Sequence, residues 1–171
     1  MGERVTVFGA GAWGSTMAQV LHDAGNDVLL WGRSDEVIDE INSAHTNSKY
    51  LDAHILPEGL KASSDLSQAF SHSHIYVLAI PAQQLRTMLA EWKPLVPANA
   101  IVVSTLKGIE ISTQMRMTEI IEEMWGVAKV GVITGPNLAD ELVLRQPAGA
   151  VAAAATQELA DFIRELFRTP Y

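Results

Sequence analysis

Short apolar runs alternate with segments of helical periodicity along almost the whole chain. The clearest runs are rich in branched and aromatic residues and lie next to Gly, Pro, Asn or Ser, which is typical of buried strands. They are Arg4–Phe8, Asp27–Trp31, His74–Ile80, Ala100–Ser104 and Lys129–Thr134, with a short strand also expected at Leu60–Ala62 and a last one of small residues at Gly149–Ala155. This alternation predicts an α/β fold of the doubly wound class, in which helices cover both faces of a mostly parallel sheet.

Between the strands, apolar residues recur at intervals of three and four, as in helices with one buried face. Ser34 and Ser64-Asp65 are expected to cap two of these helices at their N-termini. The helices are expected at Ser15–Ala24, Ser34–Ile41, from Ser64-Asp65 to Phe70, at Ala82–Trp92, from Ser112-Thr113 onward, from Asn137 onward, and at Thr156–Phe167. The segment Asn42–Gly59 is irregular and longer than a plain connection needs, which is a hint of a functional loop.

The stretch Gly9-Ala10-Gly11-Ala12-Trp13-Gly14 joins the first strand to the first helix. In this context we expect Gly9 to adopt backbone angles closed to other residues, Gly11 to let the chain approach a pyrophosphate, and Gly14 to let helix and strand pack closely. The free N–H groups at the start of the helix then face the anion. The pattern predicts a dinucleotide-binding turn of the Rossmann type, and the alternative is a glycine-rich turn without a ligand.

The second strand ends at Gly32-Arg33-Ser34, where a strand–helix–strand unit places the adenosine ribose of a bound cofactor. An NAD-selective site usually has Asp or Glu here for the ribose 2′-hydroxyl, whereas Arg suits a 2′-phosphate. We therefore expect NADP to be accepted and to be preferred over NAD. The alternative is that Arg33 is only a solvated residue at the edge of a loop.

Two further segments lie beyond predicted strands, where doubly wound sheets bind ligands. Lys107 follows the strand Ala100–Ser104 and is expected to point its ammonium group into this region, where it holds a phosphate or polarises a carbonyl. Taken alone, a loop lysine is more often a surface residue. Asn137 and Asp140 have a spacing similar to that of a capping box, which predicts a second helix N-terminus able to receive an anion.

The acidic balance of the chain restricts its partners. The 171 residues are enough for one domain with a substantial core, and the net charge is −8, from 20 acidic and 12 basic residues. This charge argues against DNA or RNA as a partner. An acidic chain that binds an anionic cofactor needs positive charge close to it, so individual Arg and Lys residues near the glycine-rich turn are candidate cofactor contacts.

Other totals restrict the setting of the chain. There is no cysteine, and His72 and His74 have no cluster of carboxylates nearby, so no disulfide and no metal site are predicted. No apolar run reaches the roughly 18 residues of a membrane span, and the chain starts without a signal-peptide core. We therefore expect no membrane partner and a cytoplasmic location.

Several motifs, in order along nearly the whole chain, make it similar to one family. They are Gly9–Gly14, Trp31-Gly32-Arg33, Asn47 with Tyr50-Leu51 and Leu56-Pro57, Pro81-Ala82-Gln83-Gln84-Leu85-Arg86, Lys107-Gly108-Ile109-Glu110, and Gly135-Pro136-Asn137-Leu138-Ala139-Asp140-Glu141. The chain thereby resembles the N-terminal half of bacterial NAD(P)-dependent glycerol-3-phosphate dehydrogenase. The resemblance implies a Rossmann-type domain from an enzyme that interconverts glycerol 3-phosphate and dihydroxyacetone phosphate by hydride transfer, for phospholipid synthesis.

The glycine-rich turn and the resemblance together assign the site residues. Cofactor contacts are expected at Gly9, Gly11, Ala12, Trp13, Gly14, Arg33, Lys107 and Ala139. The resemblance places Ala139 on the nicotinamide side and implies substrate contacts at Lys107, Gly135 and Asn137, so that Lys107 touches both ligands. Position 137 is commonly a small hydroxyl residue in the family, and Asn137 keeps a hydrogen-bonding group there.

Members of the family continue for about as many residues again, in an all-helical domain. That domain carries a second lysine, the general acid/base, and the residues that hold the substrate phosphate. We therefore expect residues 1–171 to be the NAD(P)-binding domain without the helical substrate domain, to contain no catalytic residue, and to bind cofactor with negligible turnover. Loss of a partner domain exposes apolar surface, which predicts homo-oligomerisation near the helix ending at Phe167.

Two alternatives stay open at this point. One is a free-standing nucleotide-binding or sensing module that uses the same fold without catalysis. The other is a different dehydrogenase built on this domain, acting on a hydroxy acid or a sugar nucleotide. The Lys107–Glu110 and Gly135–Asn137 elements speak against the second alternative.

Overall fold

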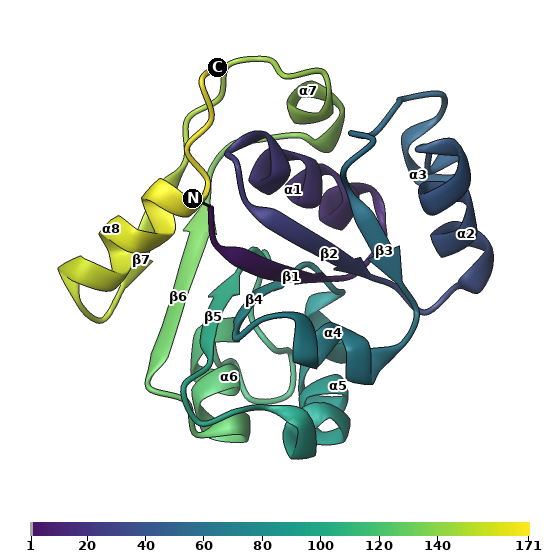
Figure 1. The fold of residues 1–171 in the computed structure, drawn as a ribbon. Helices are drawn as coiled ribbons and strands as arrows, with labels where there is room; N and C mark the ends of the chain where they lie inside the picture. The colour runs from purple at the N-terminus through teal and green to yellow at the C-terminus, as the bar shows by residue number, and fades with distance from the viewer. Residues whose placement is uncertain (1) are drawn as a thin grey trace.

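The computed structural model describes residues 2–171 and contains a seven-stranded sheet between layers of helices (Figure 1). The strands are β1 (Arg4–Phe8), β2 (Asp27–Trp31), β3 (Lys61–Ser63), β4 (Ile75–Leu78), β5 (Ile101–Ser104), β6 (Lys129–Thr134) and β7 (Val151–Ala154). The helices are α1 (Ala12–Asp23), α2 (Asp35–Ala44), α3 (Ser48–Leu51), α4 (Leu66–His72), α5 (Leu85–Trp92), α6 (Met117–Trp125), α7 (Ala139–Val143) and α8 (Gln157–Leu166), with 3-10 turns η1 (Ala82–Gln84) and η2 (Lys93–Leu95). Within residues 2–171, no helix is long and apolar enough to cross a bilayer.

The strands are arranged in the order β3-β2-β1-β4-β5-β6-β7. The first six are parallel, and β7 pairs with β6 in the antiparallel direction, with Gly131 opposite Ala154. Because β2 and β4 lie on opposite sides of β1, the winding direction reverses beside β1, which is where doubly wound sheets bind their ligands. The predicted Rossmann-type, mostly parallel, doubly wound sheet is confirmed.

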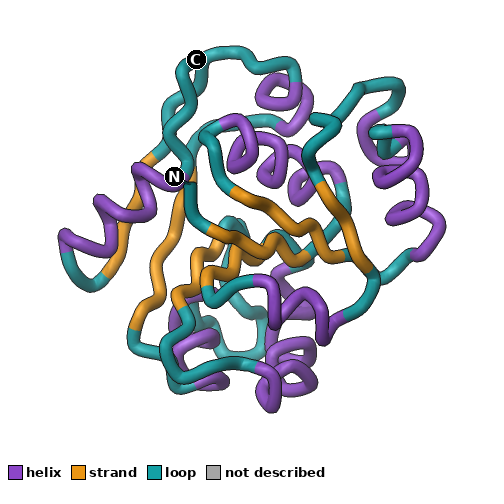
Figure 2. Tube along the Cα trace, in the orientation of Figure 1, coloured by secondary structure: helices purple, strands orange, loops and turns teal. Residues whose placement is uncertain are grey.

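Side chains of the central strands alternate between two apolar layers. Val5 and Val7 of β1 belong to a core with α1, α2 and α8, whereas Phe8 belongs to a core with α4, α5 and α6. Figure 2 shows the strands running between these two groups of helices. Both faces of the central strands are covered, which explains why β4 and β5 are buried throughout and β1 and β2 are buried after their first residue.

A cluster of aromatic rings surrounds Phe8 in the second of these cores. The ring centroids of Trp31, Phe70, Tyr76 and Trp92 lie between 4.8 and 5.8 Å from that of Phe8. The Tyr76 hydroxyl donates to the Phe70 carbonyl oxygen at 3.2 Å, and burial raises the pKa of Tyr76 to about 12. The cluster joins α4 and α5 to the strands beneath them.

Predicted cap residues are found at two helix starts. Ser34 and Asp65 each accept a hydrogen bond from a backbone N–H of the first turn, at α2 and α4 respectively, and Thr156 does the same at α8. The predicted start of the first helix is wrong. α1 begins at Ala12 and not at Ser15, because Gly11 has an extended backbone and is the N-cap.

Two other predictions about local structure are wrong. α6 begins at Met117, because Gln114 has φ 60° and Ile109 pairs with Arg116, so that a turn replaces the first turns of the expected helix. The helix expected to end at Phe70 continues to His72, the last residue of α4, whose Nε2 lies 3.1 Å from the carbonyl oxygen of Asp27.

Candidate functional site

A cleft of about 800 Å³ lies beyond the carboxyl ends of β1, β2, β4 and β5. Its lining includes most of the predicted ligand contacts, namely Gly9, Gly11, Ala12, Trp13, Arg33, Lys107, Asn137 and Ala139. These residues come from four separate parts of the sequence and meet because the sheet aligns the ends of its parallel strands. Gly14 is buried behind the turn, and Gly135 lines a neighbouring groove.

The glycines of the turn have different surroundings. Gly9 has φ 118°, a value that side chains rarely tolerate. A Cβ at Gly14 would lie 1.6 Å from the Gly9 carbonyl oxygen, whereas a Cβ at Gly11 would meet nothing within 4 Å. Gly11 is also the N-cap of α1, so the first N–H groups of that helix lie at the cleft. The geometry fits a turn that receives an anion beside Gly11.

Asn47 supports this turn from the segment that was expected to be a functional loop. Its side chain is fully buried, and its Nδ2 donates to the Ala10 carbonyl oxygen at 3.1 Å and to Ser15 Oγ at 2.8 Å. Its backbone carbonyl accepts the N–H groups of Tyr50 and Leu51 in α3. Asn47 therefore connects the glycine-rich turn to α3, whose Tyr50 lines the cleft.

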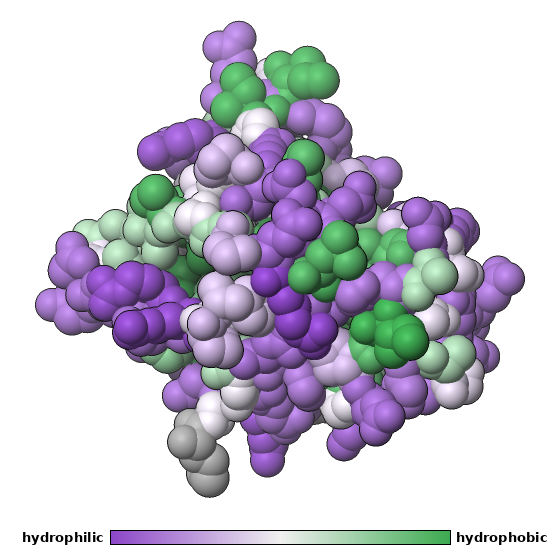
Figure 3. Space-filling view, turned by 90° about the horizontal axis from the view of Figure 1, so that it is seen from above, coloured by the Kyte–Doolittle hydropathy of each residue, from purple (hydrophilic) through white to green (hydrophobic). Residues whose placement is uncertain are grey.

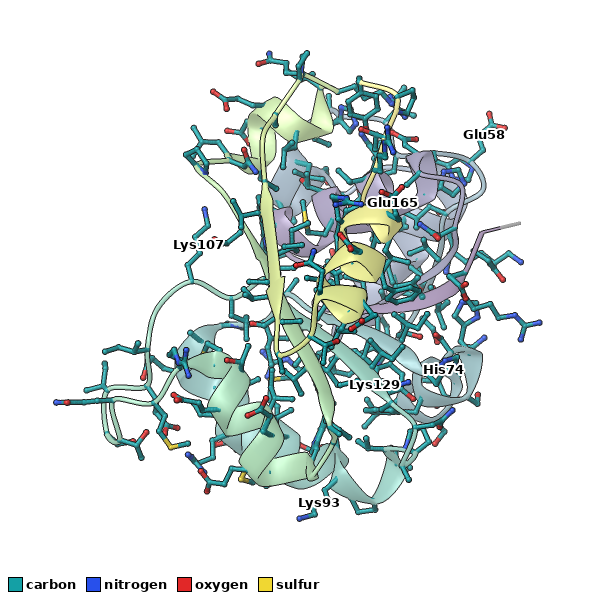
Figure 4. The ribbon with its side chains drawn as sticks, turned by 90° about the vertical axis from the view of Figure 1, so that its left-hand side faces the viewer. Glu58, His74, Lys93, Lys107, Lys129 and Glu165 are labelled. Carbon is teal, nitrogen blue, oxygen red and sulfur yellow. The ribbon has the colours of Figure 1, made fainter. Side chains whose placement is uncertain are left out.

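Trp13 and Lys107 form one wall of the cleft. Trp13 Nε1 donates to Thr105 Oγ1 at 2.9 Å, and the Thr105 hydroxyl donates to the Leu78 carbonyl oxygen at 2.8 Å. The Lys107 Nζ lies 5.3 Å from the ring centroid of Trp13, within the range of a cation–π interaction. In Figure 4, Lys107 projects from the loop that follows β5. The indole is held by Thr105 and in turn attracts the ammonium group.

Asn137 contacts Lys107 but does not cap α7. Lys107 Nζ donates to the Asn137 backbone oxygen at 3.3 Å, whereas Asn137 Nδ2 donates to the Gly149 carbonyl oxygen at 3.2 Å. The N-cap of α7 is Leu138, so the predicted capping arrangement is wrong, because the amide instead ties the turn to the segment before β7. Gly135 lies in a second groove of about 490 Å³, which shares Asn137 with the cleft.

Some lining residues were not predicted as ligand contacts. They include Ser34, Val37, Tyr50, Pro81, Thr105 and Leu106. Tyr50 is 45% exposed, and its ring lies 5.5 Å from the Nζ of Lys49. Two signals in the sequence pointed to Tyr50, namely the unusual length of the segment around it and its place in one of the motifs that carry the family resemblance. Arg33 is exposed at the end of β2, where the ribose position was expected.

The fold and the cleft define a class of protein, the Rossmann-type dinucleotide-binding domains. Residues 4–160 match a family model described as the N-terminus of NAD-dependent glycerol-3-phosphate dehydrogenase. The chain belongs to the glycerol-3-phosphate dehydrogenase family, whose members are oxidoreductases, and corresponds to its N-terminal NAD-binding domain.

Individual relatives agree with this assignment. A glycerol-3-phosphate dehydrogenase (NAD(P)+) of Corynebacterium urealyticum is 45% identical over 170 residues, covering 98% of this chain and 51% of that protein. The solved structure of the Coxiella burnetii glycerol-3-phosphate dehydrogenase has a TM-score of 0.87 at 25% identity and covers 98% of this chain and 51% of its own. The Saccharomyces cerevisiae enzyme gives 0.88 at 27% identity, with 100% and 55% covered. The chain thus spans about half the length of the curated relatives it matches.

Proposed function

We propose that this chain is the cofactor-binding half of an oxidoreductase that interconverts sn-glycerol 3-phosphate and dihydroxyacetone phosphate, in the supply of phospholipid backbones. The observation that carries the proposal is that Gly11, Arg33 and Lys107 line one cleft in a chain of the glycerol-3-phosphate dehydrogenase family. The bound NADP or NAD supplies the group that accepts or donates the hydride. The residues of this chain bind and orient the two ligands.

The cleft fits a dinucleotide in shape and charge. Its volume of about 800 Å³ lies within the usual range for ligand sites. Gly11 leaves open the space that a Cβ would fill, and the first turn of α1 contains no acidic residue to repel a pyrophosphate. Arg33 and Lys107 bring positive charge to a chain with a net charge of −8. These features support cofactor contacts along the Gly9–Gly14 turn.

The substrate is proposed to lie beside Lys107, Asn137 and Gly135. The Lys107 ammonium group lies over the Trp13 indole and donates to the Asn137 backbone oxygen, and neither of these two partners carries a negative charge. Such a group can hold a phosphate or polarise a substrate carbonyl. Ala139, also in the cleft, is proposed to face the nicotinamide.

We propose that NADP is preferred over NAD. Arg33 stands where an acidic residue would select the ribose 2′-hydroxyl, and its guanidinium suits a 2′-phosphate. Calorimetry of the chain with NADPH and NADH tests whether the cleft binds the cofactor and whether NADP is preferred. We expect Arg33→Ala to weaken the binding of NADPH but not that of NADH. Arg4→Ala is the control, because it removes the same charge from an exposed side chain at the amino end of β1, and we expect it to alter neither affinity.

This half is proposed to bind cofactor without turning over substrate, because the general acid/base of the family is expected in the helical half. Following NADPH absorbance with dihydroxyacetone phosphate checks this, first with the chain alone and then with the second half of the Corynebacterium urealyticum relative added. Turnover by the chain alone at about 10 per second, a typical enzyme rate, contradicts the proposal that the general acid/base lies in the helical half. Cofactor binding without turnover in the mixture favours a nucleotide-sensing module instead.

Self-association near Phe167 is also proposed. Phe167 is half-buried and lines the 490 Å³ groove together with Met17, Val20 and Leu142. On the face seen in Figure 3, apolar residues form separate groups among hydrophilic ones. Sedimentation of the chain at high concentration tests the idea, and a clean monomer contradicts it.

A cytoplasmic location and the lack of a nucleic-acid partner stay predictions from the sequence.

A further inference from the structure

Two segments among those that carry the resemblance follow adjacent strands and meet in the fold. They are Pro81–Arg86, after β4, and Lys107–Glu110, after β5. We propose that Gln83 and Arg86 are positioning residues for Lys107, which hold the loop between β5 and α6 so that the ammonium group stays at the cleft. This proposal rests on the proposed function, because it takes Lys107 as a ligand contact.

All three nitrogens of the Arg86 guanidinium are engaged by carboxylates. Nε donates to the two oxygens of Glu110 at 3.0 and 3.2 Å, and Nη2 donates to Glu110 Oε2 at 3.0 Å. Nη1 donates to Glu123 of α6 at 2.9 Å. Arg86 therefore ties α5 to the Lys107 loop and to α6 at once. This planar double contact suits Arg and does not suit Lys, whose ammonium group is a point charge.

Glu110 carries the effect of Arg86 into the backbone of the loop. It is 8% exposed, and a carboxylate so enclosed needs a cationic or hydrogen-bonded partner. Hydrogen bonds from Arg86 and from the Thr113 hydroxyl lower the pKa of Glu110, so it stays ionised. Its main-chain N–H donates to Met115 and its carbonyl accepts from Gln114, which closes the turn after the loop.

The side chain of Gln83 forms hydrogen bonds with the backbone of the same loop. Its Nε2 donates to the Ile109 carbonyl oxygen at 2.8 Å, and its Oε1 accepts the Ile111 N–H at 3.1 Å. The two bonds lie on either side of Glu110 in the sequence. Gln83 and Arg86 thus fix one short stretch of chain from two sides.

The other end of the loop is fixed at β4. The Thr105 N–H and hydroxyl both donate to the Leu78 carbonyl oxygen, at 3.1 and 2.8 Å. Lys107 and Gly108, the latter with φ 114°, lie between this anchor and the Gln83–Arg86 anchor. A side chain presented from a loop with both ends fixed loses less conformational freedom when a ligand binds. The β4–α5 segment therefore sets the place from which Lys107 acts.

The test compares NADPH affinity by calorimetry for Arg86→Ala, Lys107→Ala and the double variant, with Arg116→Ala as control. Arg116 borders the same loop and carries the same charge, but its 73% exposed side chain pairs with Glu119 on the surface. We expect Arg86→Ala to weaken binding roughly tenfold, Lys107→Ala at least as much, the double variant no more than Lys107→Ala, and the control not at all. Unchanged affinity in Arg86→Ala, or losses that multiply in the double variant, overturns the proposal.

Backbone amide exchange of residues 106–111, measured without ligand, separates this proposal from the proposed function. We expect faster exchange there in Arg86→Ala, with β1 and β4 protected as before, and partial recovery in Arg86→Lys. If the unaltered chain binds no NADPH, the proposed function fails and the exchange result alone decides whether Arg86 orders the loop. If Arg86→Ala does not fold, Gln83→Ala, at an exposed position, replaces it, and unchanged exchange then refutes the positioning role.

Discussion

Replacing Gly11 by alanine should weaken cofactor binding while leaving the fold intact. A Cβ at Gly11 meets nothing within 4 Å, and the residue has φ −81°, which alanine adopts readily. Alanine is a poorer N-cap than glycine but also restricts the unfolded chain, so we expect the free energy of unfolding to change by less than about 1 kcal/mol. The new methyl group stands in the space proposed for the pyrophosphate. We expect NADPH affinity to fall at least roughly tenfold, which corresponds to about 1.4 kcal/mol.

The matched change at Gly14, in contrast, should lower the stability of the fold. There a Cβ would lie 1.6 Å from the Gly9 carbonyl oxygen and 3.3 Å from Ala79 Cβ, so α1 must move away from β1 and β4. Forced overpacking of this kind costs about 1–3 kcal/mol or more, so we expect Gly14→Ala to unfold at a clearly lower denaturant concentration.

Urea unfolding followed by circular dichroism gives the stability of each variant, and calorimetry gives NADPH affinity. A role of Gly11 in admitting the pyrophosphate is refuted if Gly11→Ala binds NADPH as tightly as the unaltered chain. It is refuted equally if Gly11→Ala is destabilised as much as Gly14→Ala, because the position would then serve packing and not access.

Other changes give independent checks. Asn47→Asp leaves no donor for the Ala10 carbonyl and adds negative charge near the turn, so calorimetry should show weaker NADPH binding; unchanged affinity would contradict the supporting role of Asn47. Trp92→Ala removes a side chain that is 1% exposed and should cost about 3–5 kcal/mol in urea unfolding, and a loss below 1 kcal/mol would exclude a packed aromatic core. Burial, and repulsion from Arg145, lower the pKa of His54 from its ordinary value of 6.5, so the unfolded chain takes up this proton at higher pH than the folded one. Stability should therefore fall as pH drops below 6.5, and His54→Gln should flatten that part of the profile; an identical slope in both proteins would refute this account.

The periodic pattern of the sequence was sufficient to predict the sheet and the class of site. Buried strands, the glycine-rich turn and the position of Lys107 beyond β5 all follow from local rules of apolar spacing and turn chemistry. The positive φ of Gly9 and the close packing at Gly14 also followed, since both depend on the standard geometry of a strand–turn–helix unit, whereas the approach of a pyrophosphate at Gly11 stays a prediction. That Lys107, Asn137 and Ala139 line one cleft follows from the topology of the sheet.

What the sequence did not predict depends on contacts between distant side chains. The bond from Asn47 to Ala10 and the ion pair of Arg86 with Glu110 join residues whose sequence neighbours give no sign of a partner. The capping role expected of Asn137 failed for the same reason, because Gly149 competes for its amide. Local rules describe what a side chain prefers near its own backbone, and a tertiary partner can override that preference.

The contact of Gly9 with Ala79 also has a consequence for the order of folding. A Cβ at Gly9 would lie 2.4 Å from the Ala79 carbonyl oxygen, and the Ala79 N–H donates to the Phe8 carbonyl oxygen at 2.9 Å. The residue that follows β4 therefore packs directly against the glycine-rich turn. The unit β1–α1–β2 is complete in sequence long before β4 is synthesised. Pairing of β1 with β4 must close a long stretch of chain, which is a slow, non-local step. The ability to bind a nucleotide therefore arises late in folding, and during refolding the recovery of binding should lag behind the recovery of helical signal.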